Sequence, residues 1–172
     1  LMYNDYVLIG TKGDQLKFKE IKNIQEALKK IYDDKIKFIS RGDDSGTNKK
    51  EIILWKNLGL KVNSQKNSWY WETGSGMGSS LNIAVNKNAI ILVDRASWIS
   101  FNNKRNHTIF VEGDNDLYNY YGIIPINPTK CPKSKIGQSE KFINWLLSDK
   151  GQELINSFKN NGQQLFFGNA TN

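Results

Sequence analysis

The residues whose types and spacing best support chemistry form one run at positions 40–47, Ser-Arg-Gly-Asp-Asp-Ser-Gly-Thr. The run follows an apolar, strand-like stretch at 36–39 and precedes a helix-like stretch at 48–58. The first turn of a helix carries unpaired N–H groups and the positive end of the helix dipole. Such a loop is therefore typical of a site that holds an oxyanion without reacting with it.

The candidate ligands within this run are Arg41, Ser45, Gly46 and Thr47. The guanidinium presents a planar fork of donors, the two hydroxyl groups add donors, and the glycine lets backbone approach an ion closely. Each residue also has a structural interpretation. Ser45 or Asp44 could cap the helix, Gly46 could serve a turn, and Arg41 could pair with Asp43. Taken together, the run favours the anion site.

The same residues carry a family resemblance. Arg-x-Asp-x-Ser-Gly-Thr at 41–47 resembles the phosphate-binding loop of periplasmic phosphate-binding proteins. The longer string at 38–51, followed by Trp55-Lys56, is more similar to the TupA-type tungstate-binding proteins of ABC importers. Further stretches match that family in the same order: Met2-Tyr3-Asn4-Asp5-Tyr6, Gly74-Ser75-Gly76-Met77-Gly78, Val93-Asp94-Arg95-Ala96, Val111-Glu112-Gly113-Asp114, Leu117-Tyr118-Asn119 with Tyr121-Gly122, and Asn127-Pro128.

The resemblance implies an α/β, type II periplasmic-binding-protein-like fold and a non-enzymatic receptor without cofactor. One complete lobe would span 7–112, and 1–6 with 113–172 would form part of the other lobe. The ligand would be a tetrahedral oxyanion, tungstate or molybdate first and phosphate second. Arg41 would grip it, with the hydroxyl and N–H groups of 45–47 as further donors. The supporting residues would be Ser40, Asp43, Asp94 and Arg95. Of these, Asp43 would hold the orientation of Arg41.

By the same resemblance, the partner is an ABC permease and the location is extracytoplasmic, although no signal peptide is visible in the chain. The family begins with a signal sequence and a Thr/Ser-rich loop that supplies half of the anion's ligands. This chain starts at Leu1, at a strand that would lead into the second lobe. We therefore expect the isolated chain to bind the anion weakly or not at all, and to self-associate through an incomplete lobe.

Composition narrows the classes of protein to which this chain can belong. The 172 residues suit one compact domain or two small lobes, and no apolar run is long enough for a membrane span. The chain has one cysteine, Cys131, and one histidine, His107. A single cysteine cannot form an internal disulfide, and the two residues leave little material for a zinc site or a Ser/His pair. The net charge is +7, but lysines are spread along the chain, which argues against a nucleic-acid stripe.

Two alternatives stay open. The run Gly74-Ser75-Gly76-Met77-Gly78-Ser79, with Asp94 twenty residues after Gly74, permits a small dinucleotide-dependent enzyme built on 74–94. The preceding Trp69-Tyr70-Trp71 is atypical of a central parallel strand, and the third glycine is one position early. A basic nucleic-acid-binding module is the other alternative. Arg95 could meet an anion or brace the fold by pairing with a carboxylate.

Apolar periodicity predicts the elements that must position these residues. Helices are expected over 20–32, 46–58, 76–86, 140–147 and 152–158, and strands over 2–9, 37–40, 68–72, 89–93, 109–112 and 121–126. In the second helix, Ile52, Trp55 and Leu58 form the expected apolar stripe, widened by Ile53 and Leu54. The alternation of helices and strands predicts an α/β architecture.

Overall fold

The computed structural model describes residues 1–170, which form a mixed α/β fold with two compact units. The larger unit spans Asp5–Tyr118, and the smaller unit combines Leu1–Asn4 with the described residues from Asn119 on. The larger unit contains the range 7–112 that was predicted for one lobe. Among the described residues, no helix combines the length and the apolar character that crossing a bilayer requires.

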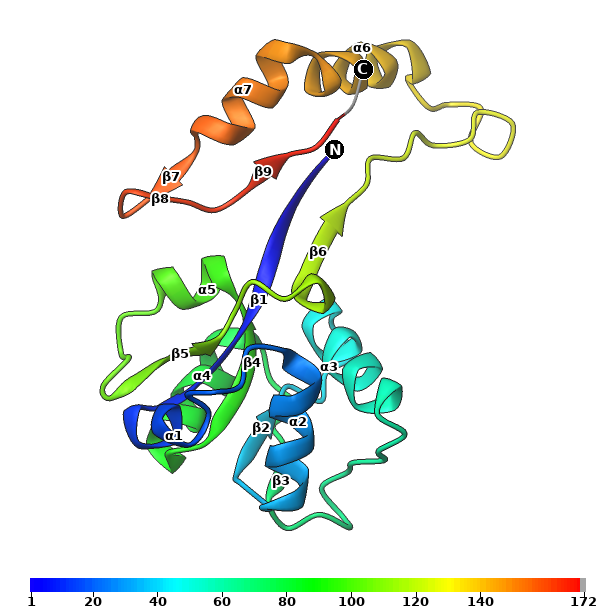
Figure 1. Cartoon of the computed structure of the whole chain (residues 1–172). Coiled ribbons are helices and arrows are strands. Elements are labelled where there is room, and N and C mark those ends of the chain that lie inside the picture. The colour runs from blue at the N-terminus through cyan, green and yellow to red at the C-terminus, as the bar shows by residue number, and fades with distance from the viewer. Residues whose placement is uncertain (171–172) are drawn as a thin grey trace. The chain divides into compact units, whose positions relative to one another are not determined.

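The larger unit alternates strands and helices, as the sequence predicts (Figure 1). Its strands are β1 (Met2–Thr11, whose first residues belong to the smaller unit), β2 (Phe38–Ser40), β3 (Tyr70–Glu72), β4 (Ile90–Asp94) and β5 (His107–Val111). Its helices are α1 (Lys12–Lys17), α2 (Ile24–Asp33), α3 (Gly46–Asn57), α4 (Met77–Lys87), α5 (Arg95–Ser100) and the 3-10 turn η1 (Asn115–Leu117).

The sheet of the larger unit has the order β3-β2-β4-β1-β5. Strand β2 runs parallel to both β3 and β4, with Phe38 beside Tyr70 on one side and Ile90 on the other. Strand β1 runs antiparallel to β4 and β5. The carboxyl ends of β2, β3 and β4 therefore share one edge of the sheet, which is where α/β folds usually bind ligands.

Both faces of this sheet are covered, because side chains along each strand alternate between two cores. In β4, Ile90 and Leu92 pack with α2 and α3, whereas Ile91 and Val93 pack with α4 and α5. Helices α3 and α4 thus lie on opposite faces, and each follows a strand that ends at the same edge. This arrangement directs two helix N-termini to that edge.

The predicted apolar face of α3 is partly wrong. Ile52 and Ile53 are 42% and 51% exposed, and the buried residues of the helix are Thr47, Asn48, Glu51, Leu54 and Trp55. Two of these, Asn48 and Glu51, are strongly polar. The helix therefore turns a polar pair into the protein beside its apolar residues, which a search for apolar stripes does not detect.

The smaller unit begins with the first residues of β1, which pair with β9 through Met2 beside Gly168 and Tyr3 beside Phe167. Its other elements are β6 (Tyr118–Tyr121, of which Tyr118 belongs to the larger unit), α6 (Ile136–Leu147), α7 (Asp149–Ser157), β7 (Lys159–Asn160), β8 (Gln163–Gln164) and β9 (Phe167–Gly168). The strand predicted over 121–126 is wrong beyond Tyr121. Gly122 directly follows the strand and Pro125 comes soon after, and both residue types are disfavoured inside strands.

Candidate functional site

The run at 40–47 joins β2 to α3 and lies at the edge of the sheet where the carboxyl ends of β2, β3 and β4 meet. Gly42 and Asp44 both adopt left-handed backbone conformations, with φ of 59° and 57°. A Cβ on Gly42 would come within 2.9 Å of the Glu72 Cβ, so glycine is required there for space as well as for φ. Asp44 is one of the few residue types that tolerate this conformation. The sequence thus determines a tight loop between strand and helix.

Arg41 and Asp43 form an ion pair within the loop, with 2.5 Å between Nη2 and Oδ2. The two side chains are only 17% and 20% exposed. The other Asp43 oxygen accepts a hydrogen bond from the Ser45 N–H at 3.3 Å. Hydrogen bonds from Ser45, and then from Arg41, lower the pKa of the Asp43 carboxyl. The Arg41 Nε–H is buried and has no acceptor among the described residues.

Asp44 points its carboxylate away from this pair. The side chain is 87% exposed and lies 3.2 Å from the Lys49 ammonium group. Its backbone N–H donates to the Asn48 Oδ1 at 3.1 Å. The carboxylates of both aspartates are therefore already engaged, Asp43 by groups of the same loop and Asp44 by Lys49 on α3.

Helix α3 begins with donors that remain available. Ser45 is its N-cap, and the Ser45 Oγ accepts from the Asn48 N–H at 3.3 Å. The N–H groups of Gly46 and Thr47 have no acceptor among residues 1–170, nor does the Thr47 hydroxyl. Ser45 thus has the capping role, whereas Gly46 and Thr47 keep free donors beside Arg41.

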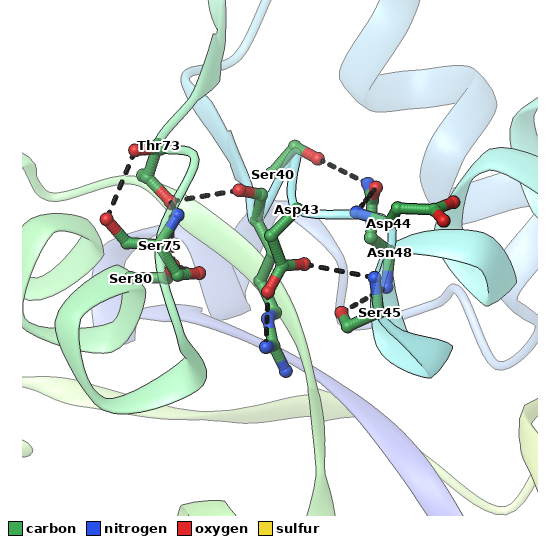
Figure 2. A network of polar contacts seen from close by, with 9 residues as sticks. Ser40, Asp43, Asp44, Ser45, Asn48, Thr73, Ser75 and Ser80 are labelled. Atoms are coloured by element: carbon green, nitrogen blue, oxygen red, sulfur yellow. Dashed lines mark hydrogen bonds and ion pairs between the residues drawn. The ribbon is translucent and has the colours of Figure 1, made fainter.

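A second loop is hydrogen-bonded to the first along the same edge. Figure 2 shows Thr73, Ser75 and Ser80 beside Ser40. The N–H groups of Thr73 and Ser75 donate to the carbonyls of Ser40 and Arg41 at 3.0 and 3.3 Å. The Thr73 hydroxyl also donates to the Arg41 carbonyl and lies 2.8 Å from the Ser80 hydroxyl. This loop fixes the backbone of Arg41 from the neighbouring strand.

The second loop leads into α4, whose N-cap Gly76 supplies no side-chain hydrogen bond. The N–H groups of the first helical residues, Met77 and Gly78, have no acceptor in the described part of the chain. Asp94, the acid that a dinucleotide site would need, caps α5 by accepting from the Ser97 N–H at 2.9 Å. The edge therefore carries a second donor-rich helix start, which the sequence pattern alone did not assign to the anion site.

Arg95 lies among carboxylates. Its Nε and Nη2 bind the two Asp5 oxygens at 2.7 and 2.6 Å, and its Nη1 lies 2.7 Å from Glu112. These contacts, led by the Asp5 hydrogen bonds, raise the pKa of Arg95. The bracing interpretation of Arg95 matches this geometry, since three guanidinium nitrogens are already used to join β1, α5 and the residue after β5.

Directly beneath the loop lies a polar cluster that the sequence analysis missed. Glu51 is 3% exposed and accepts hydrogen bonds from Ser40 Oγ at 2.6 Å, Tyr70 Oη at 2.7 Å and Trp55 Nε1 at 3.0 Å. Asn48 Nδ2 donates to Ser40 Oγ at 3.1 Å. Burial raises the pKa of the Glu51 carboxyl to about 7, against the opposing effect of these donors. The helical spacing of Asn48, Glu51 and Trp55 was the available signal.

Comparisons with known proteins agree on one family. The sequence profile of the PBP superfamily domain matches residues 1–150. The tungstate-binding protein TupA of Campylobacter jejuni is 43% identical over 170 residues, which cover 96% of this chain and 62% of that protein. This chain therefore spans less than two thirds of the length of that curated relative.

Solved structures give the same result. The tungstate-binding protein TupA from Desulfovibrio alaskensis G20 superposes with a TM-score of 0.87 at 41% identity, covering 99% of this chain and 69% of that one. The structure of the tungstate ABC transporter from Geobacter sulfurreducens superposes with a TM-score of 0.77 at 37% identity, covering 91% of this chain and 66% of that one. With the profile match over most of its length, the chain belongs to the PBP superfamily and, within it, to the family of the TupA proteins.

Proposed function

We propose that this chain is part of the substrate-binding component of an ABC importer and that it binds a tetrahedral oxyanion at the 40–47 loop. Tungstate is the first candidate, because the relatives named above are tungstate-binding proteins. Molybdate, an anion of the same charge and shape, is the next candidate. The proposal includes an extracytoplasmic location and a permease partner, and it assigns no catalytic turnover to the chain.

The observation that carries this proposal is a set of unused donors at one strand edge. The Nε–H of Arg41 is buried without an acceptor, and the N–H groups of Gly46 and Thr47 are free at the start of α3. A guanidinium beside a helix N-terminus provides both the charge and the directed N–H groups that an oxyanion needs. Arg41 is held in place by Asp43 and by the Thr73 loop.

The aspartates of the loop favour a fully ionised anion over phosphate. Tungstate only accepts hydrogen bonds, whereas protonated phosphate also donates and is best recognised by a free carboxylate. Asp43 is occupied by Arg41 and the Ser45 N–H, and Asp44 is turned toward Lys49. Neither carboxylate is left free to accept a hydrogen bond from protonated phosphate, which supports tungstate over phosphate.

The test is an NMR titration of the ¹⁵N-labelled chain with tungstate, molybdate, sulfate and phosphate at fixed ionic strength. We expect tungstate to shift the amide signals of Gly46 and Thr47, and phosphate to bind more weakly. Removing a hydrogen bond to a charged group typically costs about 1.5–3 kcal/mol. Arg41→Ala should therefore weaken tungstate binding by at least about tenfold.

Arg105→Ala is the matched control, since Arg105 is exposed and precedes β5, at the opposite edge of the sheet. It removes the same charge without touching the loop. Equal tungstate affinity in the Arg41→Ala and Arg105→Ala variants would contradict the assigned role of Arg41. The absence of any tungstate-dependent shift in the parent chain would contradict binding by this chain.

A further inference from the structure

Glu51 links the floor of the candidate site to the loop above it. Its carboxylate receives donors from three elements, namely Ser40 at the end of β2, Trp55 on α3 and Tyr70 on β3. Ser40 also accepts from Asn48, and Asn48 in turn accepts from the Asp44 N–H. A continuous chain of hydrogen bonds therefore runs from Glu51 to the backbone of the loop (Figure 2 shows its upper part).

Glu51 is also only a few residues along α3 from the free N–H groups of Gly46 and Thr47. Thr47 and Glu51 are one helical turn apart, which corresponds to a rise of about 6 Å along the axis. A charge on the Glu51 carboxylate and a charge on an anion at the start of α3 would interact through protein rather than through bulk water. The two negative charges would oppose each other.

Among residues 1–170, no cation contacts this carboxylate, and Arg41, which follows Ser40, is paired with Asp43. Its contacts on β2, α3 and β3 are Ser40, Asn48, Trp55 and Tyr70, and burial raises the pKa of the Tyr70 phenol so that it stays neutral. On α2, which packs against α3, lysines pair with aspartates at exposed positions, Lys29 with Asp33 and Lys30 with Asp34. On β4, the one charged residue is Asp94, which caps α5. Burial in this neutral setting favours the protonated carboxyl.

We propose that Glu51 is a positioning residue of the oxyanion loop and that binding of the anion is coupled to uptake of one proton by the Glu51 carboxyl. The inference rests on the proposed function. A protonated Glu51 can donate to Ser40 Oγ, so the contact with the loop is kept while the buried negative charge is removed. Because such coupling is reciprocal, deprotonation of Glu51 weakens anion binding.

The experiment measures the dissociation constant of tungstate by the same NMR titration between about pH 6 and pH 9, a range that brackets the raised pKa of Glu51. Coupling to one proton predicts that the constant rises by up to about tenfold per pH unit above about pH 7. Glu51→Gln imitates the protonated carboxyl and should bind with an affinity that does not change with pH. Cys131→Ser is the control, because it changes an exposed residue of the smaller unit and should leave the profile unchanged.

A second readout needs no variant, which matters if Glu51→Gln folds poorly. Calorimetry of the parent chain in two buffers of different ionisation enthalpy counts the protons taken up on binding. Uptake near pH 7 together with a flat profile for Glu51→Gln supports the proposal. Tungstate binding with no proton uptake, or a pH slope that persists in Glu51→Gln, overturns the coupling alone. No binding at any pH overturns the proposed function and the coupling with it.

Discussion

At the residue scale, Arg41 and Arg95 are both partly buried in the larger unit, and they differ in how many of their N–H donors lack an acceptor. Arg95 is bound on three nitrogens by Asp5 and Glu112, so it braces the protein. Arg41 has one carboxylate partner and a buried Nε–H without an acceptor. A buried, unpaired N–H on a charged group is costly unless a ligand satisfies it. This difference supports the proposal that Arg41, rather than Arg95, binds the ligand.

Glu51 should make stability depend on pH in the direction opposite to an ordinary salt-bridged carboxylate. Its pKa is raised from 4.5 to about 7 in the folded chain, so the folded state holds the proton more tightly than the unfolded state. The stabilisation is complete below pH 4.5 and is lost as pH rises through about 7. The shift corresponds to about 3 kcal/mol.

The measurement is urea unfolding of the parent chain and of Glu51→Gln across this range. Effects of other titrating groups cancel in the difference between the two free energies of unfolding. Between pH 4.5 and neutral pH, the free energy of unfolding of the parent chain should fall by about 3 kcal/mol relative to that of Glu51→Gln. A difference that stays constant with pH would contradict a buried, titrating Glu51.

At the element scale, the starts of helices determine where free N–H groups lie, and the junctions between helices determine which substitutions fit. Helices α3 and α4 begin at the carboxyl ends of adjacent parallel strands, so their N–H groups reach the same edge. In the smaller unit, α6 ends at Leu147 and α7 begins at Asp149, with Ser148 capping α7. Such a short junction forces backbone into close contact. Gly151, in the first turn of α7, is buried there.

We expect Gly151→Ala to destabilise the α6–α7 junction. A Cβ at this position would collide with the backbone carbonyls of Trp145 and Leu146, which cannot move as a flexible side chain can. Overpacking of this kind costs about 1–3 kcal/mol or more. Gly137→Ala is the control, because Gly137 on α6 has open space around it and alanine there should stabilise the helix by up to about 1 kcal/mol.

Thermal or urea unfolding of both variants checks this prediction. Gly151→Ala should lower the midpoint, and Gly137→Ala should leave it unchanged or raise it slightly. An unchanged midpoint for Gly151→Ala would show that the junction can open to accept a methyl group.

At the scale of the whole molecule, exposed apolar side chains gather on the smaller unit. Among residues 1–170, eight large ones lie there, compared with three on the larger unit; the eight are Tyr120, Ile124, Ile126, Phe142, Trp145, Leu154, Phe158 and Phe167. A groove of about 620 Å³ on the same unit is lined by Met2, Leu154, Ile155, Ser157, Phe158, Lys159 and Phe166. Clusters of this kind usually mark surfaces that another polypeptide covers.

We therefore predict that the chain self-associates through the smaller unit. The average mass measured by analytical ultracentrifugation should rise with protein concentration, and Leu154→Glu with Phe158→Glu should return the chain to a monomer. Leu16→Glu changes a residue that is 76% exposed on the larger unit and should have no effect. A monomeric parent chain at all concentrations, or equal effects of the two sets of substitutions, would contradict the prediction.

The sequence by itself determined the local parts of this protein. Apolar periodicity predicted the five strands of the larger unit and its helices α2, α3 and α4, but not the short elements α1, α5 and η1. The strand–loop–helix run around Arg41 predicted a donor-rich helix start. These features depend on contacts within a few residues, such as Ser45 capping α3 and Asp43 pairing with Arg41. Local hydrogen bonds and helix caps follow directly from residue type and spacing.

Only the tertiary structure decided which distant groups meet at that loop. Thr73 contacts the Arg41 carbonyl because β3 lies beside β2, an order that spacing along the chain does not specify. Arg95 meets Asp5 because β1 pairs with β4 in one register. Glu51 is buried because the sheet covers that side of α3 and leaves Ile52 exposed. Apolar burial is non-directional, so the final choice of buried face depends on how all the elements pack together.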